Sequence, residues 1–253
     1  MPNTTVCPTS PHITLPCLNQ VAWNQPWVWL GAGWDDFKRY WSHSLAYGAV
    51  FALLGFGLVS LTWTHHHLAM TLISGFLLVS PFLAIVFYDL SRRHERPGET
   101  AFASTRENLA SIGLFAFFLI FTLSVWERLS AILVGVHLGS SPVPEASLHW
   151  LFSSENLGFV VPFILVGGVL AALVFAIGVV SLPMLMDRRV DIVTAMMTSL
   201  WVVRENPVAM LVWAATIAVL TGIGIATSFI GLAVIFPVLG HATWHAYREL
   251  VKA

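Results

Sequence analysis

The chain has 253 residues, of which 57% are hydrophobic and only 10% are charged, whereas a typical soluble domain has about 25% charged residues. This composition excludes a water-soluble monomer, and it excludes intrinsic disorder because disordered chains are poor in apolar residues. A formal net charge of −1 leaves no strongly basic surface. We therefore expect the lipid bilayer, and no nucleic acid, as the partner.

Residues 1–42 are predicted to form a cytoplasmic tail ahead of a single six-span domain at 43–253. The tail contains both cysteines, Cys7 and Cys17. We expect two free thiols, since a disulfide would need an oxidising compartment. The tail is also rich in tryptophan: Trp23, Trp27, Trp29, Trp34 and Trp41. These side chains either anchor the chain at the membrane interface or dock a partner protein.

Apolar stretches of about 20 residues, the length that crosses a bilayer, recur along the rest of the chain. The predicted spans are 43–63, 68–90, 109–126 (in a helix extending to about 137), 157–182 and a long stretch at 207–247. As one helix that last stretch would be about twice as long as the membrane is thick, so it must fold back. The glycines of Thr221–Gly224 are the expected turn. Two full spans are expected there, and a re-entrant hairpin is the alternative.

The positions of the lysines and arginines agree with these predicted spans. All but one of the 12 lysines and arginines, Arg128 being the exception, fall on one side if six spans alternate. The positive-inside rule then places both termini in the cytoplasm. On that side, helical spacing predicts an amphipathic helix over 191–203. Asp89 and Asp187 lie beside arginines at inner helix ends, and we expect surface ion pairs there. The predicted fold is an all-α polytopic membrane bundle of about six transmembrane helices plus this cytoplasmic helix.

A faint repeat links two parts of the chain. The pairs Arg92-Arg93 and Arg188-Arg189 are each followed by an Arg-Glu-Asn triplet that ends at Asn108 and at Asn206. Each asparagine directly precedes a span, where it is expected to cap the helix. Duplication of a hairpin would explain the pattern, and the alternative is coincidence combined with the positive-inside bias.

Histidine is the main candidate for chemistry. His241 and His245 are four residues apart, so they lie on one helical face, and His43 is predicted at a similar depth. Together they could hold haem or a transition metal, and the alternative is a set of interfacial histidines that hydrogen-bond to their neighbours. A second candidate is a metal site on the turn between the first two spans, formed by His65, His66 and His67.

Several catalytic motifs are missing from the sequence. It contains no phosphate-binding loop, zinc-protease, c-type haem or nucleophile-elbow motif. These absences favour a non-enzymatic function over an enzymatic one.

Several strings of residues carry a resemblance to a known family. They are 32–37, 44–48, 80–84 through 91–93, 185–189, 206–207 and 239–248. The most specific string contains Gly240, His241, Trp244, His245, Tyr247 and Arg248. Together they resemble an uncharacterised family of bacterial integral membrane proteins, domain of unknown function 2189. The resemblance implies a bacterial inner-membrane protein, and some members of the family are labelled as cytochrome c oxidase subunits.

Three hypotheses for the function follow. The leading one is a non-enzymatic accessory or assembly component of a membrane complex, with a respiratory complex as the suggested partner. The second is a haem or metal carrier that uses His43, His241 and His245. The third is a small-solute transporter built on the repeat.

Overall fold

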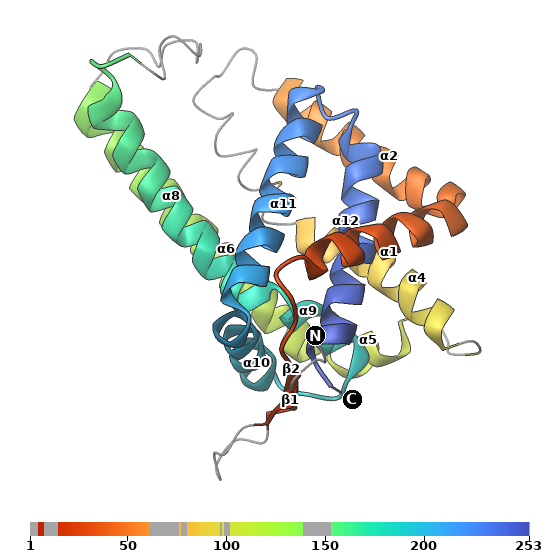
Figure 1. Ribbon diagram of the computed structural model, residues 1–253. Coiled ribbons are helices and arrows are strands. Elements are labelled where there is room, and N and C mark those ends of the chain that lie inside the picture. Colours follow the sequence, from red (N-terminus) through yellow and green to blue (C-terminus); the bar gives the residue numbers. More distant parts are fainter. Residues whose placement is uncertain are drawn as a thin grey trace.

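A computed structural model of the chain describes residues 5–7, 15–60, 76, 80–96, 98, 102–138 and 153–252. The helices in these ranges are α1 (Gln25–Arg39), α2 (Trp41–Ser60), α4 (Ile85–Glu95), α5 (Ala103–Glu107), α6 (Leu109–Leu138), α8 (Leu157–Gly178), α9 (Ser181–Asp187), α10 (Ile192–Glu205), α11 (Pro207–Ala226) and α12 (Leu232–Leu250). Two short antiparallel strands, β1 (Thr5–Val6) and β2 (Leu18–Asn19), complete the described elements. The predicted all-α membrane bundle is confirmed (Figure 1).

Four of the described segments are long and apolar enough to cross a membrane. They are Trp41–Ser60, Leu109–His137, Leu157–Asp187 and Pro207–Ala226, and they correspond to the first, third, fourth and fifth predicted spans. The predicted extension of the third helix beyond residue 126 is confirmed by α6. The first part of the second predicted span, residues 68–75 and 77–79 of 68–90, lies outside the described residues. The number of six spans therefore stays a prediction.

The apolar stretch after Pro207 folds back as expected, but not where the glycines suggested. Helix α11 continues through Gly222 and Gly224 to Ala226, and the chain reverses before Gly231. The turn contains Ser228 and Phe229 with positive φ angles of 54° and 68°. Gly224 serves helix packing instead, because a Cβ there would meet the Leu232 side chain at 2.3 Å. The expected turn at Thr221–Gly224 was therefore wrong.

Helix α12 forms the centre of the bundle, with α1, α2, α4 and α11 packed around it. Three glycines permit this packing. A Cβ on Gly33 of α1 would lie 2.6 Å from the Ala242 nitrogen, and one on Gly48 of α2 would lie 2.0 Å from the Ala233 oxygen. A Cβ on Gly240 of α12 itself would lie 2.8 Å from a ring of α4. Small residues thus let helices approach α12 closely from three directions.

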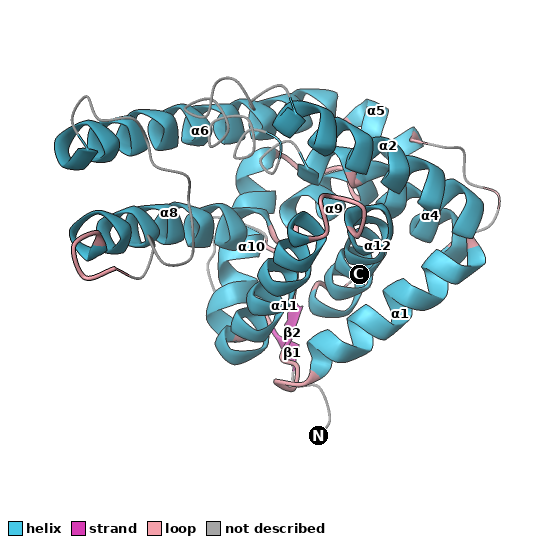
Figure 2. Cartoon of the chain, turned by 90° about the horizontal axis from the view of Figure 1, so that it is seen from above, coloured by secondary structure: helices cyan, strands magenta, loops and turns pink. Residues whose placement is uncertain are grey.

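Helices α6 and α8 form a long pair that leans away from this centre, which we call the α6–α8 arm. They lie side by side and extend well beyond the other helices (Figures 1 and 2). Trp126 of α6 packs over Gly167 of α8, and its ring lies 5.0 Å from that of Phe163. The inner end of the arm joins the bundle through α9 and α10, which pack against α8.

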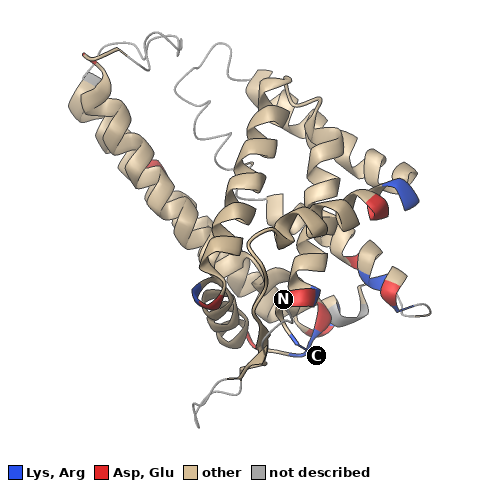
Figure 3. Cartoon of the chain, in the orientation of Figure 1, with Lys and Arg blue, Asp and Glu red and all other residues tan. Residues whose placement is uncertain are grey.

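The amphipathic helix expected over 191–203 is confirmed as α10. Asp191 caps its first turn by accepting hydrogen bonds from the Val193 and Thr194 amides. The buried positions recur every three or four residues: Ala195, Thr198, Ser199 and Val202. Figure 3 shows the charged residues gathered at this end of the molecule, near both termini, and at the ends of α1 and α4.

The N-terminal segment is held against the C-terminus. Leu18 of β2 pairs with Val251, and the Lys252 amide donates to the Cys17 carbonyl at 2.9 Å. Cys7 and Cys17 form a disulfide, so the expectation of two free thiols was wrong. The β1–β2 pairing brings the two cysteines together, a contact that sequence spacing alone does not reveal. The division into 1–42 and 43–253 stays a prediction.

Candidate functional site

His241 lies at the centre of a hydrogen-bonded cluster that joins four helices. Its Nε2 lies 3.0 Å from the Ser44 hydroxyl of α2, and its Nδ1 lies 2.8 Å from the Ser91 hydroxyl of α4. Ser91 donates to Asp36 Oδ2 of α1 at 2.6 Å. His245 Nε2 lies 2.9 Å from the same carboxylate oxygen. We call these five residues the His241 cluster.

The donors in this cluster determine the tautomer of His241. Ser91 has one hydroxyl proton, which it donates to Asp36, so its oxygen accepts from the Nδ1–H of His241. In the neutral ring Nε2 is then an acceptor, and it accepts a hydrogen bond from the Ser44 hydroxyl. Both ring nitrogens of His241 are therefore engaged inside the protein.

Asp36 carries the negative charge of the cluster. Burial raises the pKa of its carboxyl, but hydrogen bonds from His245 and Ser91 outweigh this effect and leave the pKa below its ordinary value of 3.8. Asp36 is thus ionised at neutral pH. Because His241 and Ser44 are 0% exposed, a dissolved substrate has no access to them. The cluster therefore has a structural role, in which polar contacts join α1, α2, α4 and α12.

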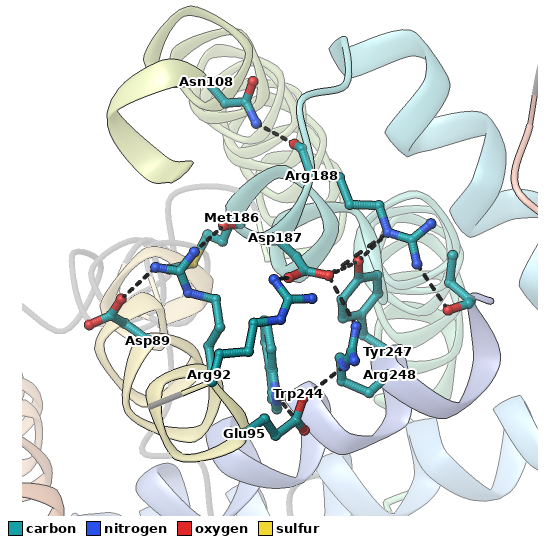
Figure 4. Close-up of polar contacts among 12 residues, drawn as sticks. Asp89, Arg92, Glu95, Asn108, Met186, Asp187, Arg188, Trp244, Tyr247 and Arg248 are labelled. Carbon is teal, nitrogen blue, oxygen red and sulfur yellow. Dashed lines mark hydrogen bonds and ion pairs between the residues drawn. The ribbon is translucent and has the colours of Figure 1, made fainter. Parts of the chain in front are cut away.

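A second group, the Asp187 cluster, surrounds a carboxylate whose side chain is 1% exposed (Figure 4). The Tyr247 hydroxyl donates to Asp187 Oδ2 at 2.7 Å and accepts from Arg188 Nε at 2.9 Å. Arg96 and Arg248 place Nη1 atoms 3.0 and 3.3 Å from the two carboxylate oxygens. Glu95 joins the cluster because its Oε2 lies 2.8 Å from Arg248 Nε.

The second aspartate expected at the surface is buried as well. The Asp89 side chain is 0% exposed and lies 3.4 Å from Arg92 Nη2, which is itself 1% exposed, and 3.0 Å from Arg93 Nε. It also accepts from the Phe102 amide at 3.0 Å. The prediction of surface ion pairs at Asp89 and Asp187 was therefore wrong. Both lie where packed helices exclude water, and several donors offset the cost of burying each charge.

The two repeat-related asparagines use their side chains differently from the prediction. Asn206 precedes α11 without capping it, and its Oδ1 accepts from the Val21 amide instead. Asn108 is buried and donates to the backbone oxygens of Leu185 and Arg188. Tertiary contacts therefore take the polar atoms that were expected to bond within the helix.

The three histidines proposed to hold a cofactor each have different contacts in the structure. His43 is exposed, and its ring contacts the neighbouring Ser42. The next serine, Ser44, is the one that reaches His241. His241 and His245 are linked through Ser91 and Asp36.

The turn of His65, His66 and His67 lies outside the described residues. Among the residues that the structure does describe, no group of three or more histidines, cysteines or carboxylates is arranged to hold a metal ion. The haem or metal hypothesis stays a prediction.

Asp36, Ser44 and Ser91 had no predicted role, although each belongs to a string that carried the family resemblance. The sequence does single out these residues, because each is a polar residue inside or next to an apolar stretch, where an unpaired polar group is costly. The sequence does not show which of these side chains hydrogen-bond to one another. These residues lie in the strings 32–37, 44–48 and 91–93, far from α12 in the sequence, and only the fold brings them to it.

A cavity of about 580 Å³ lies between the α6–α8 arm and the helices α4, α11 and α12. Its described lining is largely apolar, with a few polar side chains such as Tyr88, Thr122 and Thr243. Two of these are already engaged, since Thr122 and Thr243 donate to backbone oxygens of their own helices. The transporter hypothesis stays a prediction.

Comparison with known proteins gives one match. The model of the family described as predicted integral membrane protein (DUF2189) matches residues 68–187. This segment includes Ser91, the buried Asp89 and Asp187, and the whole α6–α8 arm. The chain matches no curated protein and no solved structure. The resemblance inferred from the sequence is thus confirmed for residues 68–187, just under half of the chain, which are similar to the DUF2189 family of predicted integral membrane proteins.

Proposed function

We propose that this integral membrane protein is a non-enzymatic accessory or assembly component of a larger membrane complex, with a respiratory complex as the first partner to test. The observation that carries the proposal is the α6–α8 arm. In the apolar window of Leu157–Asp187 only 11% of the residues are buried, and in that of Leu109–His137 only 22%. Two long helices therefore pack mainly on each other and present their remaining faces outwards.

Those outward faces combine large apolar side chains with small residues. Phe117, Ile164 and Val169 are 65–67% exposed. In the part of the chain that the structure describes, no atom of another helix lies within 4 Å of the position that a Cβ on Gly113 of α6 or Gly168 of α8 would occupy. Between helices in a membrane, close approach at small residues takes the place of the hydrophobic effect. These uncovered glycines would allow a helix of another protein to approach closely.

We propose further that the protein lies in a bacterial inner membrane with both termini in the cytoplasm. The distribution of lysine and arginine supports this orientation. The Cys7–Cys17 disulfide points the other way, because stable disulfides are typical of oxidising compartments and cytoplasmic ones are mostly transient. Reporter fusions in the 91–108 connection test the orientation, which is contradicted if those reporters lie in the periplasm.

The partner proposal is tested by tagging the chain, purifying it from native membranes in mild detergent, and identifying co-eluting proteins by mass spectrometry. A fixed set of membrane proteins should co-elute, and Gly168→Leu should reduce its recovery several-fold by filling the bare face. Val219→Leu, at a 60% exposed position of α11, is the matched control. Recovery of the wild-type chain alone as a monodisperse protein would contradict the proposal. An optical spectrum of the same sample tests the haem alternative.

A further inference from the structure

We propose that the Asp187 cluster is a binding site for the headgroup of an anionic phospholipid. Three arginines converge there from the end of α4, the end of α9 and the last turn of α12 (Figure 4). They are Arg96, Arg188 and Arg248, and among the described residues the carboxylates of Asp187 and Glu95 lie beside them.

Arg188 and Arg248 are held in place by bonds that use only part of their guanidinium groups. Arg188 donates through Nε to Tyr247 and through Nη2 to the Val251 carbonyl. Arg248 uses Nε on Glu95 and Nη1 on Asp187. Among the described residues, Arg188 Nη1 and Arg248 Nη2 have no hydrogen-bond partner. A guanidinium fixed at one edge presents its remaining N–H groups in a geometry that suits a phosphate.

The cluster is accessible as well as fixed. The side chains of Arg96, Arg188 and Arg248 are 38%, 22% and 27% exposed, whereas Asp187 at the centre is 1% exposed. An anion approaching from outside thus meets guanidinium groups before it meets the carboxylate. The surrounding helix ends carry further charge, which places the cluster at the membrane–water boundary of the bundle (Figure 3).

A lipid headgroup is the phosphate source that this location favours. The spans continue directly from the cluster, since Asp187 ends the apolar segment that starts at Leu157. Basic pockets between transmembrane helices at the headgroup level bind anionic lipids. A free phosphate would gain only the charge contacts, whereas a phospholipid would also place its acyl chains beside the apolar helices.

The test is to measure, by native mass spectrometry and by titration in nanodiscs, how strongly the full chain retains phosphatidylglycerol relative to phosphatidylcholine. We expect at least tenfold preference for phosphatidylglycerol. Each of Arg188→Gln and Arg248→Gln should reduce that preference about fivefold. Arg188→Lys should retain part of it, because the charge remains. Arg189→Gln is the control, as this residue is 80% exposed and pairs with Glu107 outside the cluster.

The wild-type chain alone can overturn the proposal, even if a glutamine variant does not fold. Equal retention of the two lipids would show that the cluster does not select an anionic headgroup. Inorganic phosphate that competes as strongly as phosphatidylglycerol would show a free-phosphate site instead. Folded glutamine variants that keep the full preference would place the lipid elsewhere.

Discussion

The α12 centre and the α6–α8 arm solve the problem of packing in a membrane in opposite ways. Around α12, buried polar side chains from α1, α2 and α4 meet in one hydrogen-bonded cluster, and glycines bring the helices close together. The arm has long apolar helices and few buried positions. Since lipid is as apolar as a leucine side chain, only the first arrangement defines which helices pair. The contrast indicates that the centre fixes the fold, while the arm remains available to lipid or a partner.

Removing the Asp187 carboxylate should have the largest effect on the centre. Asp187→Ala leaves Tyr247 and three arginines without their common acceptor, and we expect a loss of about 3 kcal/mol in the free energy of unfolding. This is the low end for a buried charge pair, because the arginines are partly exposed. Unfolding in detergent measures the loss. The removal of an exposed carboxylate, Asp35→Ala, is the control, and equal stability of the two variants would contradict the central role of Asp187.

Adding one methyl group to a glycine should change the stability of the protein differently in the two regions. Gly48→Ala places a Cβ within 2.0 Å of the Ala233 oxygen, so α2 or α12 must shift. We expect a cost of about 2 kcal/mol. Gly168→Ala in the arm meets no atom within 4 Å and should change stability by less than about 0.5 kcal/mol. Thermal unfolding of the two variants compares them, and similar losses would remove the distinction between centre and arm.

Replacing His241 by leucine should have a smaller effect. The substitution keeps an apolar volume but deprives the buried Ser44 and Ser91 hydroxyls of their ring partner. We expect a loss of about 1–2 kcal/mol, which Ser44→Ala in the same chain should partly restore by removing the unpaired group. If Ser44→Ala adds its own full cost instead, the two side chains are not coupled.

Acidification should have the smallest effect on stability, and we expect that effect to act through Asp36. Because its folded pKa lies below the unfolded value of 3.8, ionised Asp36 stabilises the fold above about pH 4. That contribution is lost as the pH falls through the lowered folded pKa. Unfolding temperatures between pH 3 and 7 measure it, and Asp36→Asn should lose less stability on acidification than the wild-type chain. Identical acid profiles would rule out this role of Asp36.

The sequence predicted features that depend on local composition, and it failed where a side chain has a distant partner. The apolar runs predicted α2, α6, α8 and α11, and helical spacing with a polar end predicted α10. The burial of Asp89 and Asp187 depends on how α4 and α9 pack, which no single segment reveals. Likewise Gly224 looked like a turn because its packing partner Leu232 was unknown.

The histidines show the same limit. Their four-residue spacing placed His241 and His245 correctly on one helix, yet the same spacing gave no information on the partners of their rings. Those partners are Ser44, Ser91 and Asp36, which lie about 150 residues or more away along the chain. Similar depth in the membrane suggested His43 as a partner, whereas the printed contact to His241 comes from the next residue, Ser44. The short step from His43 to Ser44 turns the side chain to another face of α2.

The ¹⁵N spectrum of His241 in lipid bilayers tests the central claim most directly, because both ring nitrogens are assigned defined partners. At neutral pH we expect a protonated Nδ1 and an unprotonated, hydrogen-bonded Nε2, with both signals changed by Ser91→Ala. Protonation at Nε2, or a ring that exchanges protons freely with water, would contradict the account of a closed cluster at the centre of the bundle.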